Sequence, residues 1–92
     1  MRDRPDWTFL SNHAHVIVCL AHEADSRIRD LAEHVGITER TVTAIIADLE
    51  QAGIVTIEKV GRRNRYRINR RARLRHPIEQ HKTVGDLLKA IS

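Results

Sequence analysis

Residues 30–45, which read DLAEHVGITERTVTAI, decide the fold of this chain. Apolar side chains recur in this stretch at the three- and four-residue intervals that place them on one face of a helix. Gly36 interrupts the pattern where a helix end favours a residue that accepts a positive φ, and Thr38 offers an oxygen to cap a following helix. The stretch therefore predicts two helices that bury these residues: Leu31, Ala32, Val35, Ile37, Val42, Ile45 and Ile46.

Two helices joined by a short turn that contains glycine form a helix-turn-helix. Upstream of it, Ser11 is placed to cap a first helix that runs to about His22; the second helix is predicted over 29–35 and the third over 39–52. After Gly53 the residues become strand-like, and two strands are predicted at 54–60 and 65–69, joined by a loop at 61–64. The pattern indicates a β-hairpin directly after the third helix.

A last helix is predicted over residues 77–92, with Pro77 in its first turn. One face of that helix is apolar and carries Val84, Leu87, Leu88 and Ile91. The predicted class is mainly α (α+β): a winged helix-turn-helix with a three-helix core, a two-stranded β-hairpin wing and a C-terminal helix. We expect a loose arm at 1–10, the winged helix-turn-helix at 11–69 and a basic linker at 70–76.

The cationic residues are gathered in one part of the chain, although the net charge is only +4. No acidic residue lies between Lys59 and Ile78, whereas this stretch carries Lys59, Arg62, Arg63, Arg65, Arg67, Arg70, Arg71, Arg73 and Arg75. A local field of one sign attracts a polyanion, and phosphate backbones are the commonest such partner. The alternative is a solvated basic segment with no partner.

The 30–45 stretch resembles the helix-turn-helix of bacterial and archaeal regulators. The segment that follows, LEQAGIV at 49–55, and the hairpin VGRRNRYRI at 60–68 are similar to the end of the recognition helix and the wing of MarR and ArsR type regulators. The resemblance covers about residues 9–70. It implies sequence-specific binding of double-stranded DNA by a transcriptional regulator, with a repressor favoured over an activator.

The predicted DNA-binding residues lie on the third helix and on the wing. The helix, 39–52, is expected in a major groove, where Arg40 is suited to guanine and threonine methyls to thymine. The wing, 61–65, is expected on a minor groove or the backbone. The full set is Thr38, Arg40, Thr41, Thr43, Ala44, Arg62, Arg63, Asn64, Arg65 and Arg67. The alternative for the wing is a sheet edge that charge protects from aggregation.

The first helix is apolar over more than one face, because Val16, Ile17 and Leu20 suit the core and other apolar residues remain. A two-fold interface with a second copy would cover them, and a homodimer would favour palindromic DNA. The predicted dimer residues are Ala14, Val18, Ala21, Val84, Leu87, Leu88 and Ile91, with Trp7, Phe9 and Leu10 beside them. The alternative is that the last helix folds back on its own first helix in a monomer.

Other function classes find little support in the sequence. No catalytic motif, cofactor-binding motif or membrane-spanning run is present, and the N-terminus lacks a signal-peptide pattern, so a cytoplasmic protein that is not an enzyme is expected. His15, Cys19 and His22 share a helix face, but a buried cysteine beside two polar histidines explains them, and no metal site is predicted. The rival function is a winged-helix module that binds other proteins, which would not need arginines at the hairpin tip.

Overall fold

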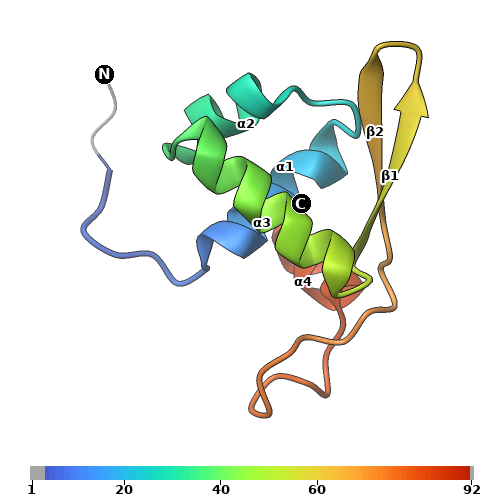
Figure 1. Cartoon of the computed structure of the whole chain (residues 1–92). Helices are drawn as coiled ribbons and strands as arrows, with labels where there is room; N and C mark the ends of the chain where they lie inside the picture. The colour runs from blue at the N-terminus through green and yellow to red at the C-terminus, as the bar shows by residue number, and fades with distance from the viewer. Residues whose placement is uncertain (1–3, 92) are drawn as a thin grey trace.

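The computed structural model describes residues 4–91, and the elements follow the predicted order (Figure 1). Three helices come first: α1 (Asn12–His22), α2 (Ile28–Val35) and α3 (Glu39–Gln51). The antiparallel strands β1 (Val55–Val60) and β2 (Arg63–Ile68) and the helix α4 (Val84–Ile91) complete the fold. The predicted winged helix-turn-helix of α+β class is confirmed. None of the helices between residues 4 and 91 has the length and hydropathy needed to cross a bilayer.

Local capping explains where the first three helices begin and end. The Ser11 hydroxyl accepts a hydrogen bond from the Ala14 amide at 3.3 Å, and the Thr38 hydroxyl accepts one from the Thr41 amide at 3.1 Å. Each satisfies a donor that a helix N-terminus leaves unpaired. Gly36 has a φ of 86° and its amide donates to Ala32, which ends α2 in the left-handed conformation. Both predicted caps and the predicted glycine turn are confirmed.

The core forms around α1, whose Val16 and Leu20 are almost completely buried. This helix packs against α2, α3, β2 and α4. Aliphatic side chains dominate the core, which contains Val16, Ile17, Leu20, Leu31, Ala32, Val42, Ile45, Ile46, Leu49, Ile54, Val55, Tyr66, Val84 and Leu88. Among the helix-turn-helix residues predicted to be buried, Val35 and Ile37 are half-buried and pack against this core.

The hairpin is tighter than predicted. The strands pair from Val55 with Ile68 to Val60 with Arg63, so only Gly61 and Arg62 form the turn. Gly61 has a φ of 65° and Arg62 has no positive φ, the pattern of a type II′ turn, which matches the twist of two paired strands. The predicted loop at 61–64 is therefore wrong at its second half, because Arg63 and Asn64 belong to β2.

The predicted start of the last helix at Pro77 is also wrong, since α4 begins at Val84. The Thr83 amide donates to the Asp86 carboxylate at 2.9 Å, and the Asp86 amide donates back to the Thr83 hydroxyl at 3.1 Å. This is a capping box. The Thr83 hydrogen bonds hold the pKa of the Asp86 carboxyl below its ordinary value. Residues 76–82 instead form turns, and the Leu74 amide donates to the Lys82 carbonyl at 2.9 Å.

The segment at 70–76, expected to be a linker, is paired with the residues that lead into α4. The amides of Val84 and Gly85 donate to the carbonyls of Ala72 and Arg70 at 2.8 and 2.9 Å. A Cβ atom on Gly85 would lie 2.9 Å from the Arg70 carbonyl oxygen, so a glycine is needed for this close approach. These contacts explain why α4 cannot begin earlier.

Part of the N-terminal arm is fastened to the helical body. The Arg4 guanidinium donates to the carbonyls of Val35 at 3.1 Å and Glu33 at 3.5 Å. A cation at this position also complements the partial negative charge at the end of α2. The prediction of a loose arm is therefore wrong at Arg4, and residues 1–3 of the predicted arm lie outside the described residues.

The last helix folds back onto its own chain. Val84 and Leu88 are 4% and 0% exposed and join the core beside α1, whereas Leu87 is half-buried and Ile91 is 48% exposed. This is the arrangement that the sequence left open as the alternative to an intermolecular helix pair. It means that α4 contributes directly to the stability of the single chain.

Replacing Leu88 with Ala should lower the free energy of unfolding by about 2–5 kcal/mol, because it leaves a cavity in a completely buried site. Urea denaturation followed by circular dichroism measures this change. The control Ala90→Gly lies on the exposed side of α4 and should cost about 1 kcal/mol at most. Equal effects of the two substitutions would show that α4 does not belong to the core.

Candidate nucleic-acid interface

The exposed side of α3 carries the predicted recognition residues. Val42, Ile45, Ile46 and Leu49 are buried on its inner side. Arg40, Thr41, Thr43 and Ala44 are exposed on the other, and Ala47 continues this surface by one turn. Within residues 4–91, the Arg40 guanidinium makes no hydrogen bond and no ion pair with another residue. It is therefore available to a ligand, and the two alanines leave room for close approach.

The threonine hydroxyls of this helix are already engaged within it. The hydroxyls of Thr38 and Thr41 are 2.8 Å apart, and both take part in the cap at the start of α3. The Thr43 hydroxyl donates to the Glu39 carbonyl at 3.0 Å. Thr38 thus has a structural role. In Thr43 the hydroxyl is engaged within the helix, so the methyl group is the part that can contact a ligand.

The arginines of the hairpin differ in their environment. Arg62 occupies the turn and is exposed. Arg63 begins β2, and its guanidinium donates to the Asp25 carbonyl at 2.6 Å, which fastens the hairpin to the loop between α1 and α2. Only Arg62 therefore has an unattached guanidinium at the tip.

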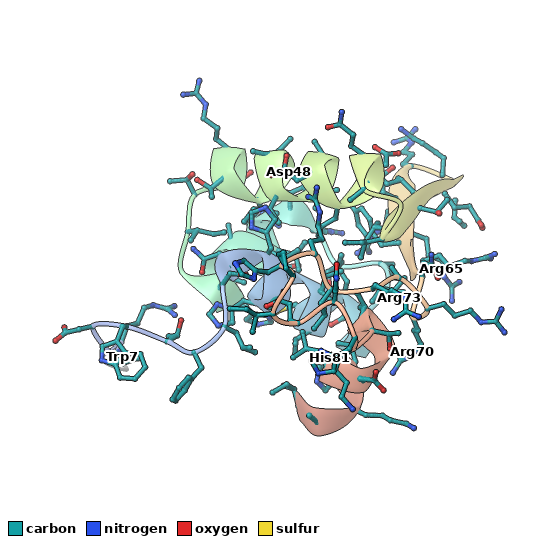
Figure 2. All side chains as sticks on the ribbon, turned by 90° about the horizontal axis from the view of Figure 1, so that it is seen from below. Trp7, Asp48, Arg65, Arg70, Arg73 and His81 are labelled. Atoms are coloured by element: carbon teal, nitrogen blue, oxygen red, sulfur yellow. The ribbon has the colours of Figure 1, made fainter. Side chains whose placement is uncertain are left out.

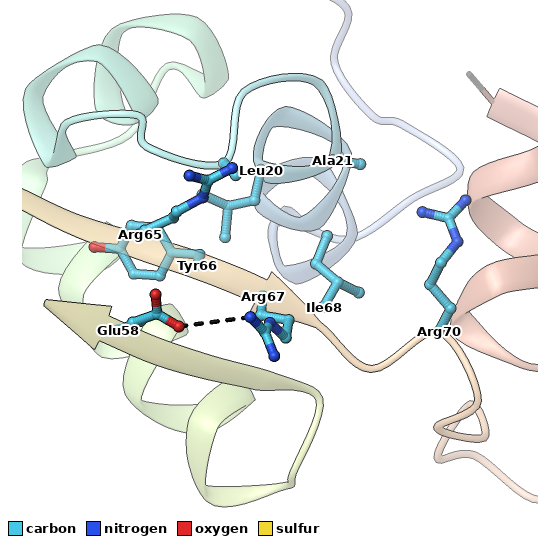
Figure 3. Close-up of a pocket in the computed structure, with 9 residues that line it drawn as sticks. Leu20, Ala21, Glu58, Arg65, Tyr66, Arg67, Ile68 and Arg70 are labelled. Atoms are coloured by element: carbon cyan, nitrogen blue, oxygen red, sulfur yellow. Dashed lines mark ion pairs between the residues drawn. The ribbon is translucent and has the colours of Figure 1, made fainter. Parts of the chain in front are cut away.

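Arg65 and Arg67 lie on the outward face of β2. The Arg67 guanidinium is 3.5 Å from the Glu58 carboxylate across the hairpin (Figure 3), in an exposed pair of the kind that contributes at most about 1 kcal/mol. Both arginines also border a shallow hollow of about 520 Å³ beside Leu20. Asn64 falls on the same side of the strand as buried Tyr66, so it is not on the arginine face.

The exposed face of α3 lies opposite its buried inner side, whereas Arg65 and Arg67 of the hairpin border a hollow that Leu20 of α1 also lines. The inner sides of α3 and β2 both pack against that helix. The two elements diverge from the turn at Gly53 (Figure 1), where the Ile54 amide donates to Leu49 and the Asn69 amide to Ile54. Because the hairpin follows α3 directly and Arg62 at its tip is exposed, a single extended ligand can touch both elements.

The basic run continues beyond the wing as a fixed surface. All of the cationic residues predicted from the run between Lys59 and Arg75 are exposed. Figure 2 shows Arg65 and Arg70 at the end of the molecule opposite Trp7. Between 71 and 75, exposed arginines alternate with half-buried Ala72 and Leu74, the pattern of an extended segment with one face on the core.

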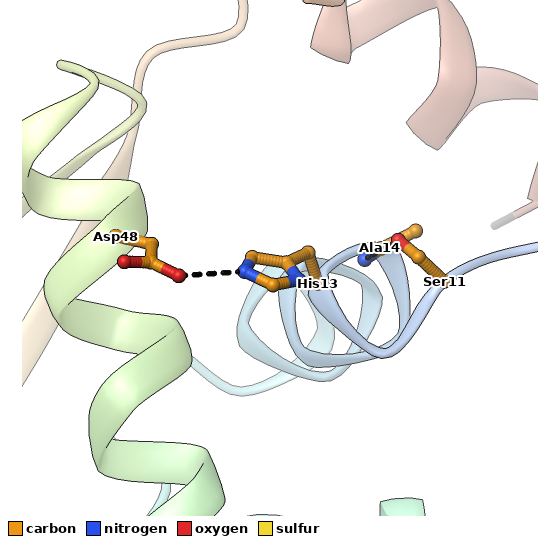
Figure 4. Close-up of polar contacts among 4 residues, drawn as sticks. All are labelled: Ser11, His13, Ala14 and Asp48. Atoms are coloured by element: carbon orange, nitrogen blue, oxygen red, sulfur yellow. Dashed lines mark hydrogen bonds and ion pairs between the residues drawn. The ribbon is translucent and has the colours of Figure 1, made fainter.

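An interaction that the sequence did not predict joins α1 to α3. The His13 imidazole lies 3.0 Å from the Asp48 carboxylate (Figure 4). The two residues are 35 positions apart, and no spacing rule relates them. This contact places Asp48 against α1, at a groove that Arg73 and Arg75 of the basic run also line.

The histidines and the cysteine of α1 do not form a metal site. His15 pairs with the Asn12 side chain at 3.2 Å, and within residues 4–91 no three potential ligands gather closely enough to hold a metal ion. Cys19 is half-buried, and burial raises the pKa of its thiol. A protonated thiol is a poor nucleophile and a poor metal ligand.

The residues predicted for a dimer interface do not form one surface. Val84 and Leu88 lie inside the core, and Val18 is half-buried against it. Ala14 and Leu87 border a groove on the outside of the molecule, Ala21 is exposed near the end of α1, and Ile91 is exposed on α4.

Comparison with known families agrees with this geometry. The family model described as a Crp-like helix-turn-helix domain matches residues 14–76, which include most of α1, the helix-turn-helix, the hairpin and the whole basic run. No curated protein matches the chain. The narrower resemblance to the MarR and ArsR regulators is not confirmed by this match. Because the matched region spans well over half of the chain, the chain belongs to the family of Crp-like helix-turn-helix domains, which are winged helix-turn-helix domains of DNA-binding regulators.

Proposed function

We propose that this protein binds specific sites in double-stranded DNA with α3 in the major groove and the hairpin on the adjacent minor groove or backbone. The observation that carries the proposal is that the exposed side of α3, with Arg40, is followed directly by a hairpin whose tip exposes Arg62. Arg62 supplies an unattached cation at the tip, where a narrow minor groove concentrates negative potential.

The two surfaces have different roles in the proposal. The arginines of the hairpin contact phosphates or the minor groove and contribute affinity that depends little on sequence. Arg40 and the methyl of Thr43 face base edges and contribute discrimination. Because α3 offers few other polar side chains toward DNA, few base pairs in each half-site are read directly.

A second copy completes the proposed DNA complex. Two recognition helices related by a two-fold axis meet half-sites about one helical turn apart, so the preferred site is an inverted repeat with about 10–10.5 bp between half-site centres, or a multiple of that spacing. The regulatory outcome that we favour is repression, and it stays a prediction.

Arg62→Ala should weaken binding to specific and unrelated duplexes alike and reduce the slope of log affinity against log salt by about one unit. Fluorescence polarisation with the duplex upstream of the chain's own gene, and with a scrambled duplex, at several salt concentrations measures both effects. Lys89→Ala removes the same charge from the exposed side of α4 and serves as the matched control. If neither substitution changes affinity or slope, the hairpin does not contact DNA.

Arg40→Ala should cost about 1–3 kcal/mol on the best site and much less on scrambled DNA, because loss of a bidentate contact to a base affects only the matching sequence. The same polarisation assay compares the two duplexes. Equal losses on both would identify Arg40 as a phosphate contact and remove it from the residues that read sequence.

Thr43 allows a paired test, because its hydroxyl is bonded to the Glu39 carbonyl. Thr43→Val keeps a methyl group and should retain the preference for thymine, whereas Thr43→Ser keeps the hydroxyl and should lose it. Binding to the best site is compared with binding to the same site made with deoxyuridine. The assignment of the methyl as the contact is wrong if the serine variant still distinguishes the two duplexes.

A further inference from the structure

Two of the three aromatic residues lie where they contribute little to the stability of a single chain. Tyr66 is buried, but Trp7 is 69% exposed and Phe9 is 93% exposed. Their rings form an edge-to-face pair with centroids 5.2 Å apart. Figure 2 shows Trp7 projecting away from the helical body. Two large aromatic side chains that stay exposed, outside a core built almost entirely of aliphatic residues, indicate an interaction surface.

The arm that carries these rings is held at both ends. Arg4 is bonded to the end of α2, and Ser11 caps the start of α1. Between them, the Thr8 hydroxyl donates to the Leu10 carbonyl at 2.7 Å. The rings are thus presented on a short anchored segment, which reduces the conformational entropy that a partner must remove on binding.

A groove of about 610 Å³ begins at the base of this arm. Its walls come from α1, the end of α3, residues 73–75 of the basic run and α4. Its apolar lining includes Ala14, Ile17, Leu49, Ala52, Leu74 and Leu87. Arg73 and Arg75 also line it. Guanidinium groups beside an apolar wall suit aromatic rings, because they stack favourably on a ring face.

We propose that this groove receives Trp7 and Phe9 of a second copy of the chain, and that the second copy receives the same pair in return. Phe9 itself stands at the edge of its own groove, so a two-fold axis beside residues 9–11 brings each arm to the opposite groove. This inference rests on the proposed function in one respect, because both take a second copy of the chain as the partner. What it adds is the surface through which the two copies bind each other.

The area available agrees with a stable dimer. An aromatic side chain buries about 150–250 Å², so four rings contribute about 600–1,000 Å². The groove walls that they cover bring the total to the lower end of the range of specific interfaces. The helix pair predicted from the sequence offers less, since Val84 and Leu88 are already buried within the single chain.

The single tryptophan makes the proposal directly measurable. In the intact protein, the emission of Trp7 should shift to shorter wavelength and its quenching by acrylamide should fall as the protein is concentrated, in step with a rise to the dimer mass in light scattering. Phe9→Ser should raise the dimer dissociation constant. Ile78→Ser is the matched control, because Ile78 is 80% exposed and does not line the groove.

The groove is tested by Ala14→Glu. Position 14 lies three residues after the Ser11 cap, where a glutamate completes a capping box and so favours α1. In the dimer the longer side chain would occupy space that the partner's rings fill, which should raise the dissociation constant by about tenfold or more. Circular dichroism checks that the variant remains folded.

The outcomes separate this inference from DNA binding. Loss of the dimer in Phe9→Ser and Ala14→Glu but not in Ile78→Ser, with binding to a single half-site retained, supports it. A monomer at all concentrations overturns it, and so does a dimer in which Trp7 remains open to acrylamide. Loss of DNA binding by the intact protein would contradict the proposed function and leave the dimer result unchanged.

Discussion

The burial of one face of α1 is the interaction on which the rest of the structure depends. Val16 and Leu20 on that face are almost fully buried, and α2, α3, β2 and α4 all pack against the helix. Because α3 and the hairpin rest on the same support, the angle between them is set by the core and not by the turn at Gly53 alone. A change in the volume of the α1 face would therefore move the two proposed DNA contacts relative to each other.

Most of the fold could be predicted because its signals are local. The caps at Ser11 and Thr38 and the left-handed turn at Gly36 depend on residues three or four positions apart, and each appears where the sequence indicates it. The exposed side of α3 follows from the same helical period. The late start of α4 has a local signal as well, since Thr83 and Asp86 have the spacing of a capping box, but Pro77 is an equally good start of a helix by sequence alone.

The parts that could not be predicted depend on contacts between distant residues. Arg63 was expected at an open tip, yet its guanidinium bonds to the Asp25 carbonyl, 38 positions earlier. The pairing of His13 with Asp48, and of Arg4 with the end of α2, likewise has no periodic signature. The helix and the hairpin that carry the candidate site could therefore be predicted from local patterns, whereas the partners of each side chain required the three-dimensional arrangement.

The anchoring of Arg4 has a thermodynamic consequence. Its guanidinium lies against Gly36, in the turn that leads into α3, while the same short arm carries Trp7 and Phe9. A partner that displaces the arm therefore changes the contacts at the N-terminal side of the recognition helix. Under the two proposals above, self-association and DNA binding are therefore linked equilibria, and the factor by which one alters the affinity of the other must be the same in both directions.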